Sequence, residues 1–475
     1  MTTLMTPDTG RGSRGPAIAR FDGFRGRLIP ADHPDYDIAR AVWNGAIDRR
    51  PHLIARCTGT ADVITAVRFA REHGLEIAIR GGGHNVAGTA VCDEGIVIDL
   101  SSMRAVRVDP SDRSAWVQGG ALWGDVDHET QAHGLATTGG IVSHTGVAGL
   151  TLGGGVGWLM RKHGLTIDNL LAANVVTADG ELVRASADEH ADLFWALRGG
   201  GGNVGVVTSF EFRLHAVGPT VLAGPILWDA SDASEVLRFY RDFIREAPDE
   251  LGTVVRFGAA PPLPDIPEKL HGRPVLIVAS CFAGRVEDGE RAVRPLRACR
   301  TPLLDLVGPT AYTGFQSAID TTVAHGWHYY WKSTYLPALR DDLIDVLAEH
   351  AFSCASPRSY VAMFHLEGAV SRAADGGTAF GNRQAPHAIT LDAVWRPGED
   401  FGERDTAWTR RFFAALAPFR EGVYVNFLGG DEAPGRVREA YGDSVYERLV
   451  DVKTLYDPDN VFHHNQNIRP RSAPS

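Results

Sequence analysis

The sequence predicts an α+β protein with two main domains, the second of which holds an antiparallel sheet flanked by helices. Three observations support this fold class. A chain of 475 residues is too long for one compact core. Apolar runs of strand length alternate with amphipathic segments of helix length. The 53 glycines cluster in loops before about residue 218, and their density falls afterwards.

Composition excludes several classes of protein. The net charge of −11 and the lack of a basic block argue against a nucleic-acid partner. The five cysteines are scattered and form no C-x-x-C pair, so neither a disulfide framework nor a metal site is expected. No run approaches the ~18 apolar residues of a membrane span, and no membrane partner is expected. Residues 1–34 are interpreted as a flexible leader rather than a signal peptide, which predicts a cytoplasmic protein.

The first elements have the pattern of a βαβ unit. LIARC (53–57) is of strand type, residues 61–74 form an amphipathic segment that ends at a glycine, and EIAIR (76–80) is a second strand. Short apolar runs closed by Gly, Asp or Pro then predict a meandering sheet. These runs are residues 95–100, 105–110 and 114–120.

The following residues complete one α+β unit of about 160 residues. A helix is predicted at 121–134, and a glycine-dense tract occupies 139–170. Residues 171–186 form a hairpin on an Asp-Gly turn. A short helix and glycine loop (192–205) then lead into a strand at 206–214.

A second sheet is predicted after about residue 218. Its strands are VLAGPILW, PVLIVASCFAG, HYYWKSTYLP and SYVAMFHLEGAV, separated by helices such as ASEVLRFYRDFIREAP. The last segment (446–470) is a helix stopped by Asp457-Pro458 and followed by an extended Asn-rich tail. The predicted domains are therefore residues 35–217, residues 218–440, and a C-terminal segment at 441–475.

One glycine loop matches the dinucleotide fingerprint in the wrong context. Gly200, Gly202 and Gly205 satisfy G-x-G-x-x-G. That fingerprint needs a strand before it and a helix after it, so that pyrophosphate meets a helix N-terminus. Here a helix precedes the loop and a β-branched strand follows, which argues against Rossmann-type binding.

RGGGH (80–84) is a more specific signal. Three glycines leaving a strand expose successive backbone N–H groups, which can cradle phosphate oxygens. The pentapeptide alone is equally compatible with a tight turn beside a surface histidine. A second glycine tract about 60 residues later indicates a long ligand with a flat ring and a pyrophosphate, which favours FAD over NAD.

Four motifs together resemble a known family. They are RGGGHNVAG, the tract GGIVSHTGVAGLTLGGGVGWLMRKHGLTIDNLL, the loop LRGGGGNVGVVTSFEF and the tail KTLYDPDNVFHHNQNIRP. In this order they resemble the berberine-bridge-enzyme-like branch of the vanillyl-alcohol-oxidase flavoproteins, over residues 35–470. The resemblance implies a PCMH-type FAD-binding domain of two subdomains, followed by a substrate domain.

The resemblance also implies how FAD is held. His84 matches the histidine bonded to the flavin 8α-methyl carbon, and the pyrophosphate loop is Arg80, Gly81, Gly82, Gly83 and Asn85. Many relatives have a second tether, a cysteine, at the position of Val142, so a single covalent bond is expected here. The isoalloxazine and ribityl chain should meet Gly139, Gly146, Gly149, Gly153 and Gly154. Val207 should approach the adenine, and Asn465 and Asn467 should close the site.

Flavin oxidation needs a base near the substrate. Tyr424 and Asn426 match a Tyr-x-Asn strand that reaches the flavin in relatives, and Tyr424 ranks first. It could act as a base only if a cation such as Lys332 lowered its pKa, and it could instead be a core tyrosine. Strand alternation places His365 and Glu367 on one face, which is either catalytic or an outer solvated face.

The favoured function is that of an oxidase. A small alcohol, amine or secondary-metabolite substrate would give hydride to FAD, and dioxygen would take the electrons to form hydrogen peroxide. A flavin dehydrogenase or a flavin-oxygenating enzyme of the same fold remains the alternative. Two hypotheses from other functional classes are a flavin-binding protein without catalytic turnover and an NAD-binding dehydrogenase.

Overall fold

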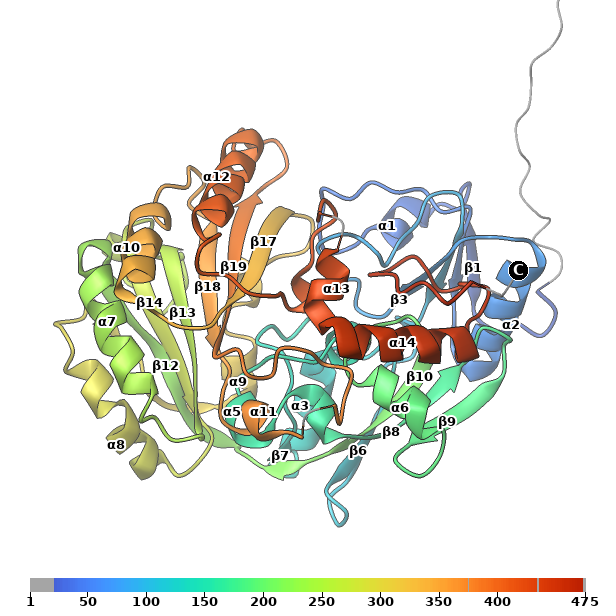
Figure 1. The fold of residues 1–475 in the computed structure, drawn as a ribbon, viewed down its shortest axis with the longest axis horizontal. Coiled ribbons are helices and arrows are strands. Elements are labelled where there is room, and N and C mark those ends of the chain that lie inside the picture. The colour runs from blue at the N-terminus through green and yellow to red at the C-terminus, as the bar shows by residue number, and fades with distance from the viewer. Residues whose placement is uncertain (1–20, 375, 434, 473–475) are drawn as a thin grey trace, which may run out of the picture.

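The computed structural model describes residues 21–374, 376–433 and 435–472. The α+β class is confirmed, because helices and mainly antiparallel sheets build two lobes that lie side by side (Figure 1). The first lobe holds a four-stranded and a five-stranded sheet, and the second holds an eight-stranded sheet.

The predicted βαβ unit lies in the four-stranded sheet. Helix α2 (Thr60–Glu72) buries Val63, Val67 and Ala70 against the sheet, at the spacing of one helix face. The strands, in spatial order, are β1 (Arg27–Pro30), β2 (Leu53–Arg56), β4 (Ile96–Asp99) and β3 (Ile77–Arg80). Strand β4 lies parallel between β2 and β3, so residues 95–100 do not belong to the predicted meandering sheet. Only the antiparallel pair at 106–109 and 114–118 is present.

Residues 21–34 do not belong to a flexible leader. Residues 1–20 lie outside the described residues. Phe21 packs in the core beside α2, and β1 pairs antiparallel with β2. Residues 21–34, which include β1 and lead to α1 (Tyr36–Arg40), therefore belong to the folded first lobe.

The five-stranded antiparallel sheet carries the glycine-rich segments between its strands. Its order is β5 (Val106–Asp109), β6 (Ser114–Gln118), β10 (Val206–Arg213), β8 (Leu170–Val176) and β9 (Leu182–Ser186). The predicted hairpin at 171–186 and the strand at 206–214 are present. The connecting elements are α3 (Trp123–Gln131), β7 (Leu135–Ala136), α4 (Val147–Leu152), α5 (Met160–His163), a 3-10 turn η2 (Thr166–Asn169), α6 (Ala191–Leu197) and β11 (His215–Ala216), which pairs with β7.

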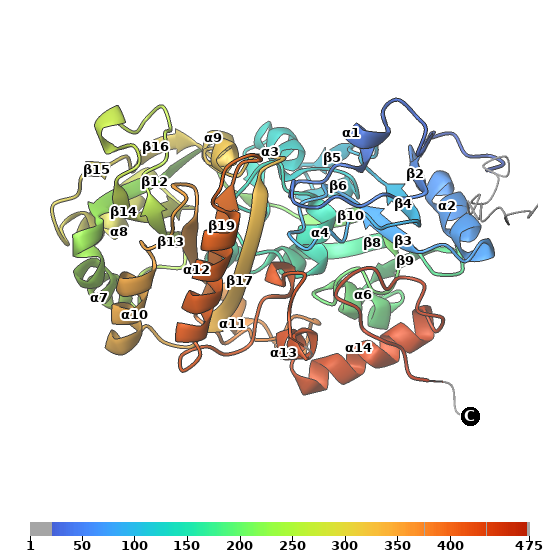
Figure 2. The ribbon, with the colours of Figure 1, turned by 90° about the horizontal axis from the view of Figure 1, so that it is seen from above.

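The eight-stranded antiparallel sheet carries its four long helices on one face. Its strands are β15 (Leu304–Asp305), β12 (Thr220–Asp229), β14 (Pro274–Phe282), β13 (Leu251–Ala259), β18 (Tyr360–His365), β19 (His387–Trp395) and β17 (His328–Leu336), with β16 (Gly308–Ala311) on β12. The covering helices are α7 (Ala233–Ile244), α8 (Val286–Arg297), α10 (Asp341–His350) and α12 (Gly402–Ala415). These helices lie on the outer side, so the other face turns toward the first lobe (Figure 2). Shorter elements of this lobe are η3 (Ala230–Asp232), η4 (Glu268–Leu270), α9 (Tyr312–Gln316), η5 (Asp320–Thr322) and α11 (Ala369–Arg372).

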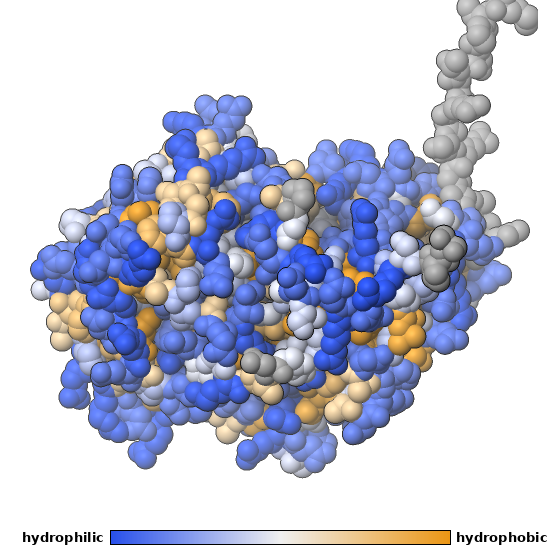
Figure 3. Space-filling model, viewed as in Figure 1, coloured by the Kyte–Doolittle hydropathy of each residue, from blue (hydrophilic) through white to orange (hydrophobic). Residues whose placement is uncertain are grey.

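The C-terminal segment crosses back to the first lobe. After the turn η6 (Val425–Phe427) and helix α13 (Arg436–Tyr441), α14 (Asp443–Tyr456) packs against α6. Phe462 joins the core of the four-stranded sheet. Polar residues cover most of the face in Figure 3, with apolar residues scattered between them. Within the described ranges, no helix combines the length and the apolar character that a membrane crossing requires.

Candidate active site

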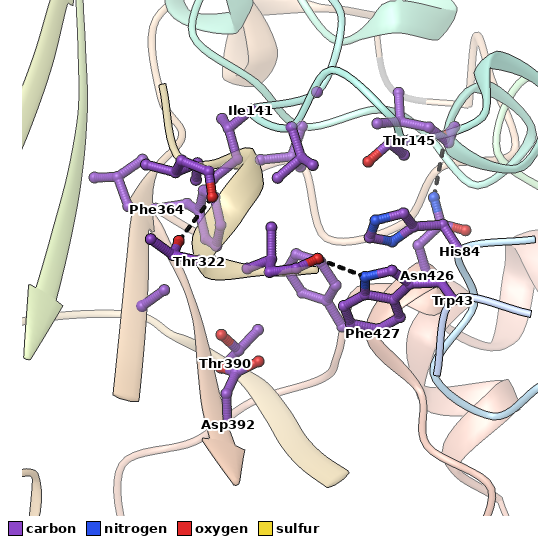
Figure 4. A pocket seen from close by; sticks show the side chains of 18 of the residues that line it. Trp43, His84, Ile141, Thr145, Thr322, Phe364, Thr390, Asp392, Asn426 and Phe427 are labelled. Carbon is purple, nitrogen blue, oxygen red and sulfur yellow. Dashed lines mark hydrogen bonds between the residues drawn. The ribbon is translucent and has the colours of Figure 1, made fainter. Parts of the chain in front are cut away.

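A cavity of about 620 Å³ lies between the two lobes. Its floor is formed by the glycine loops around residues 81–85, 140–150 and 201–203, and its roof by the face of the eight-stranded sheet that turns toward the first lobe. The segments 424–427 and 465–466 complete its wall. Figure 4 shows His84 and Trp43 on one side of this space, and Thr390 and Asp392 on another.

The first two glycine tracts meet backbone to backbone. A Cβ on Gly82 would lie 2.5 Å from the backbone N of Gly146, and a Cβ on Gly146 would lie 2.4 Å from the N of Gly82. Gly83 has a φ of +66°, a left-handed conformation that favours glycine. Larger residues would separate the two loops, so the glycines keep an open backbone surface facing the cavity.

Arg80 lies behind this loop rather than in the main cavity. Its Nη1 donates to the backbone O of Ala39, whereas its Nε and Nη2 find no partner among the described residues. With Gly81, Gly82 and Gly83 it lines a smaller cavity of about 190 Å³. Buried donors without partners mark a place where a polar ligand group would be stabilised.

His84 is held in a fixed orientation at the cavity floor. Its ring stacks on Trp43 with centroids 4.2 Å apart, and Trp43 Nε1 donates to the O of Val323 at 2.7 Å. Its Nε2 lies 3.2 Å from Nδ1 of His144. Burial, His144 and His325 hold the pKa of His84 well below its usual value. The imidazole is therefore neutral at physiological pH and keeps a nitrogen lone pair.

The other predicted cofactor residues divide into two groups. Asn85, Val142, Gly146, Gly149 and Asn465 line the cavity. Gly139, Gly153 and Gly154 lie one layer behind it, because Cβ atoms there would meet Trp123, Asn426 and Phe380. The three glycines therefore do not line the cavity as predicted. Val207 is packed in the core, and Asn467 is not among the lining residues.

Tyr424 and Asn426 reach the cavity, but not from a strand. They lie at a single 3-10 turn, η6. The Tyr424 hydroxyl accepts hydrogen bonds from Gly155 N and from Asn426 Nδ2, each at 2.8 Å. Burial raises the pKa of Tyr424 to about 12, against the opposing effect of these bonds. Tyr424 is therefore a neutral phenol in the folded protein.

Lys332 does not supply the expected charge to Tyr424. It points to the other side of β17, where its Nζ donates to Asp431 at 2.7 Å and to Glu432 at 3.1 Å. Trp331, its neighbour on the strand, lines the cavity instead. The prediction that Lys332 lowers the pKa of Tyr424 is wrong.

The catalytic face assigned to β18 was also wrong. Met363 packs into the core beneath the outer helices. His365 is fully buried, and its Nε2 lies 2.6 Å from Oε2 of Glu367, which follows the end of the strand. The residues that line the cavity are Tyr360, Ala362 and Phe364. Alternation grouped the side chains correctly, but the opposite face meets the cavity.

Sequence reasoning missed Trp43, His144 and Asp392. Trp43 and His144 are distant in sequence from His84 and meet it only through the fold. Asp392 carried a signal, because it is the only charged residue within the strand HAITLDAVW. A buried carboxyl in an apolar strand is costly and calls for an explanation.

The residues present fit FAD. A glycine cradle next to partnerless Arg80 donors suits a pyrophosphate, and the long cavity beyond it suits a flat ring system. His84 stands where the two parts meet. Among the residues that the structure describes, no group of three or more His, Cys, Asp or Glu side chains is arranged to hold a metal ion.

Comparison with known proteins agrees with this geometry. Residues 51–186 match the family model described as "FAD binding domain", and residues 423–469 match "Berberine and berberine like". The (R)-6-hydroxynicotine oxidase of Paenarthrobacter nicotinovorans is 32% identical over 472 residues, covering 94% of this chain and 98% of that protein.

Solved structures share the whole fold. The 6-hydroxy-D-nicotine oxidase of Arthrobacter nicotinovorans has a TM-score of 0.83 at 30% identity, covering 96% of this chain and 100% of that one. The glucooligosaccharide oxidase of Acremonium strictum, described with a 6-S-cysteinyl, 8α-N1-histidyl FAD, has a TM-score of 0.82 at 24% identity and covers 94% and 98%. The chain thus belongs to the berberine-bridge-enzyme-like family of FAD-linked oxidoreductases and is an FAD-dependent oxidase.

Proposed function

We propose that this oxidase holds FAD through one covalent bond to His84 and oxidises a small organic substrate, with dioxygen as the electron acceptor and hydrogen peroxide as the product. The observation that carries the proposal is the His84 site. A neutral imidazole, clamped by Trp43 and His144, follows directly on the glycine cradle.

A single tether is supported by Val142. The glucooligosaccharide oxidase carries both a cysteinyl and a histidyl bond to its FAD. Val142 lines the cavity here and has no thiol. The five cysteines all lie elsewhere, and burial raises the pKa of Cys57, Cys92 and Cys281, which keeps them as thiols.

The chain's own residues would bind and orient the cofactor and substrate. Backbone N–H groups of Gly81, Gly82 and Gly83 would hold the pyrophosphate, with the arginine behind them. Tyr424 and Asn426 would fix the wall beside the reacting ring, while the apolar roof excludes water. When bound, FAD supplies the acceptor for a hydride from the substrate.

We assign the domains accordingly. Residues 21–217, together with the returning segment 441–472, would form the FAD-binding domain, and residues 218–440 the substrate domain. The eight-stranded sheet, which begins at β12, supplies the roof.

A His84→Ala variant tests the proposal. Wild-type protein should stay yellow after acid precipitation and show a fluorescent band on a denaturing gel, and the variant should lose both. Rapid reoxidation of the reduced wild-type flavin in air, with one hydrogen peroxide formed per flavin, would support the oxidase reaction. If wild type released its flavin on unfolding, the covalent bond to His84 would be contradicted. If the reduced flavin were reoxidised only slowly in air, dioxygen would not be the electron acceptor.

A further inference from the structure

Arg256 places a positive charge on the largely apolar roof of the cavity. It lies in β13, in register with Ile277 of β14 and Ala362 of β18. All three residues line the cavity, so Arg256 lies on the face of the sheet that turns toward the first lobe. Within the described ranges, it is the only lysine or arginine in the lining of this cavity.

The fold uses only part of the hydrogen-bonding capacity of Arg256. Its Nη1 donates to the O of Ala259 at 3.0 Å, and its guanidinium lies 4.8 Å from the centre of the Tyr360 ring. Among the described residues, its Nε and Nη2 make no hydrogen bond and it forms no ion pair. A guanidinium carries several N–H donors in a planar fork, so most donors of Arg256 remain available to a ligand.

The titratable groups around Arg256 do not neutralise its charge. They are Tyr360, Cys354 and Asp392. Burial raises the pKa of the phenol and of the thiol, so both groups are neutral. Burial also raises the pKa of Asp392 to about 7, although Thr390 and Arg256 oppose the shift, so this carboxyl is only partly ionised near neutral pH. Burial lowers the pKa of Arg256 itself, but an arginine stays protonated in proteins.

Asp265 is the other carboxyl in the lining of the cavity. It is exposed, so water and salt screen its charge. The roof therefore presents a cation without a full counter-charge in surroundings of low dielectric constant, which is unfavourable. An anionic ligand removes this penalty, and the guanidinium fork matches the two oxygens of a carboxylate. A neutral ligand would leave the charge uncompensated, and a cationic ligand would be repelled.

The rest of the roof favours an apolar body for this ligand. The side chains on the same face of the sheet are mainly aliphatic or aromatic and include Leu227, Val254, Ile277, Ala279, Ala362 and Phe364. A sugar would bury hydroxyl groups against these side chains without hydrogen-bond partners. A ring system would bury apolar surface there instead.

We propose that Arg256 is a specificity-determining residue that binds the carboxylate of an apolar, ring-bearing acid, and that the substrate of this enzyme is such an acid. The assignment as a substrate rests on the proposed oxidation, whereas the binding of the carboxylate does not. An acid held by its carboxylate at the roof extends its ring toward the floor of the cavity, where His84 lies.

Calorimetric titration of the holoenzyme with benzoate, benzamide and benzamidine tests this preference for a negative charge. The three compounds have nearly the same shape and carry a negative, no and a positive charge at neutral pH. Wild type should bind benzoate about tenfold more tightly than benzamide, or more, and should bind benzamidine least tightly. In Arg256→Met the affinity for benzoate should fall to that for benzamide, and the affinity for benzamide should stay as in wild type.

Two further variants separate the charge of Arg256 from its shape and from general effects of losing an arginine. Arg256→Lys keeps the charge but not the planar fork, so it should keep part of the preference for benzoate. Arg184→Met is the matched control, because Arg184 also lies over an aromatic ring, 5.2 Å from the centre of Trp116, but outside the cavity. This variant should bind all three compounds as wild type does.

Two results would overturn the inference. One is wild-type protein that binds benzamide or benzamidine as tightly as benzoate, and this comparison needs no variant to fold. The other is an equal loss of affinity for benzoate and benzamide in Arg256→Met, because Arg256 would then act only on the shape of the roof. The titrations measure binding at equilibrium without turnover. They therefore stay readable if the bond to His84 or the role of dioxygen proves wrong.

Discussion

At the scale of single residues, the Tyr424 hydroxyl joins the two sides of the site. It accepts hydrogen bonds from Gly155 N and Asn426 Nδ2, and Asn426 also donates to the O of Leu150 at 3.0 Å. These contacts fix the turn at η6 against the second glycine tract. Tyr424 is therefore better suited to hold the wall in place than to take up a proton.

Tyr424→Phe should lower the free energy of unfolding by about 1–3 kcal/mol, since it leaves buried donors without an acceptor. With a pKa of about 12, Tyr424 keeps its proton throughout the neutral range. The pH profile of flavin reduction should therefore keep its shape in the variant. Urea unfolding and a pH series of anaerobic reduction check the two parts, and loss of an ionisation from the profile would restore Tyr424 as the base.

Residues on the cavity floor could be predicted where a short sequence motif contained them. RGGGH pointed to His84 and its loop because glycine and histidine are adjacent in sequence. The orientation of β18 could not be predicted, because alternation groups Ala362 with Phe364 and Met363 with His365 without saying which pair faces inward. The choice depends on which face the helices cover, and that is a property of the folded domain.

At the scale of elements, the close contact of two loops sets the shape of the cavity floor. Gly82→Ala would place a Cβ 2.5 Å from the backbone of Gly146, and no side chain can move to relieve it. We expect a loss of about 1–3 kcal/mol of stability and a lower flavin content. The control is Gly308→Ala, where a Cβ meets nothing within 4 Å. Equal flavin content and stability in both variants would contradict the contact.

Helices α3 and α9 meet at a buried carboxyl. Gln316 Nε2 donates to Asp127 at 3.1 Å, and burial raises the pKa of Asp127 from 3.8 to about 7. Because the folded-state pKa of Asp127 lies above the unfolded one, the protonated carboxyl favours the folded state. This contribution to stability is complete below about pH 4 and is lost as the pH rises to about 7.

Asp127→Asn should remove that dependence. Between about pH 4 and pH 7, the free energy of unfolding of wild type should fall by up to about 4 kcal/mol more than that of the variant. This follows from about 1.4 kcal/mol for each unit of pKa shift. Urea unfolding at several pH values measures the difference. Parallel pH curves for the two proteins would show that Asp127 does not titrate between the helices.

Element types were largely predictable, but their partners were not. The helix at α3 and the hairpin β8–β9 follow from local periodicity and turn residues. Strand β4 was placed in the wrong sheet because its parallel partners, β2 and β3, are joined to it through a helix and a glycine loop. Pairing of this kind depends on the whole domain.

At the scale of the molecule, the chain crosses from one lobe to the other and then returns. Glycine density predicted the change near residue 218, and the resemblance of the tail to the family predicted the return. The cavity between the lobes could not be predicted, because its lining comes from segments as distant as Trp43, Phe364 and Asn465. Each is brought there by a different part of the fold.

A buried lysine joins the returning segment to the third glycine loop. Lys453 of α14 is fully buried and donates to Asn203 O at 2.7 Å, Phe462 O at 2.9 Å and Asp457 at 2.6 Å. Asn203 lies in the third glycine loop and lines the cavity. One ammonium group therefore joins helix, tail and cavity floor.

Lys453→Met should lower the free energy of unfolding by about 3–5 kcal/mol, because it leaves the Asp457 carboxylate buried without its cation. The same change should loosen Asn203 and lower the flavin content of the purified protein. Arg471→Met is the control, since Arg471 pairs with Asp451 at the surface and its loss should cost about 0–1 kcal/mol. If urea unfolding and flavin absorbance were the same in both variants, the returning segment would not depend on this lysine, and the tail would be held by apolar contacts such as those of Phe462 instead.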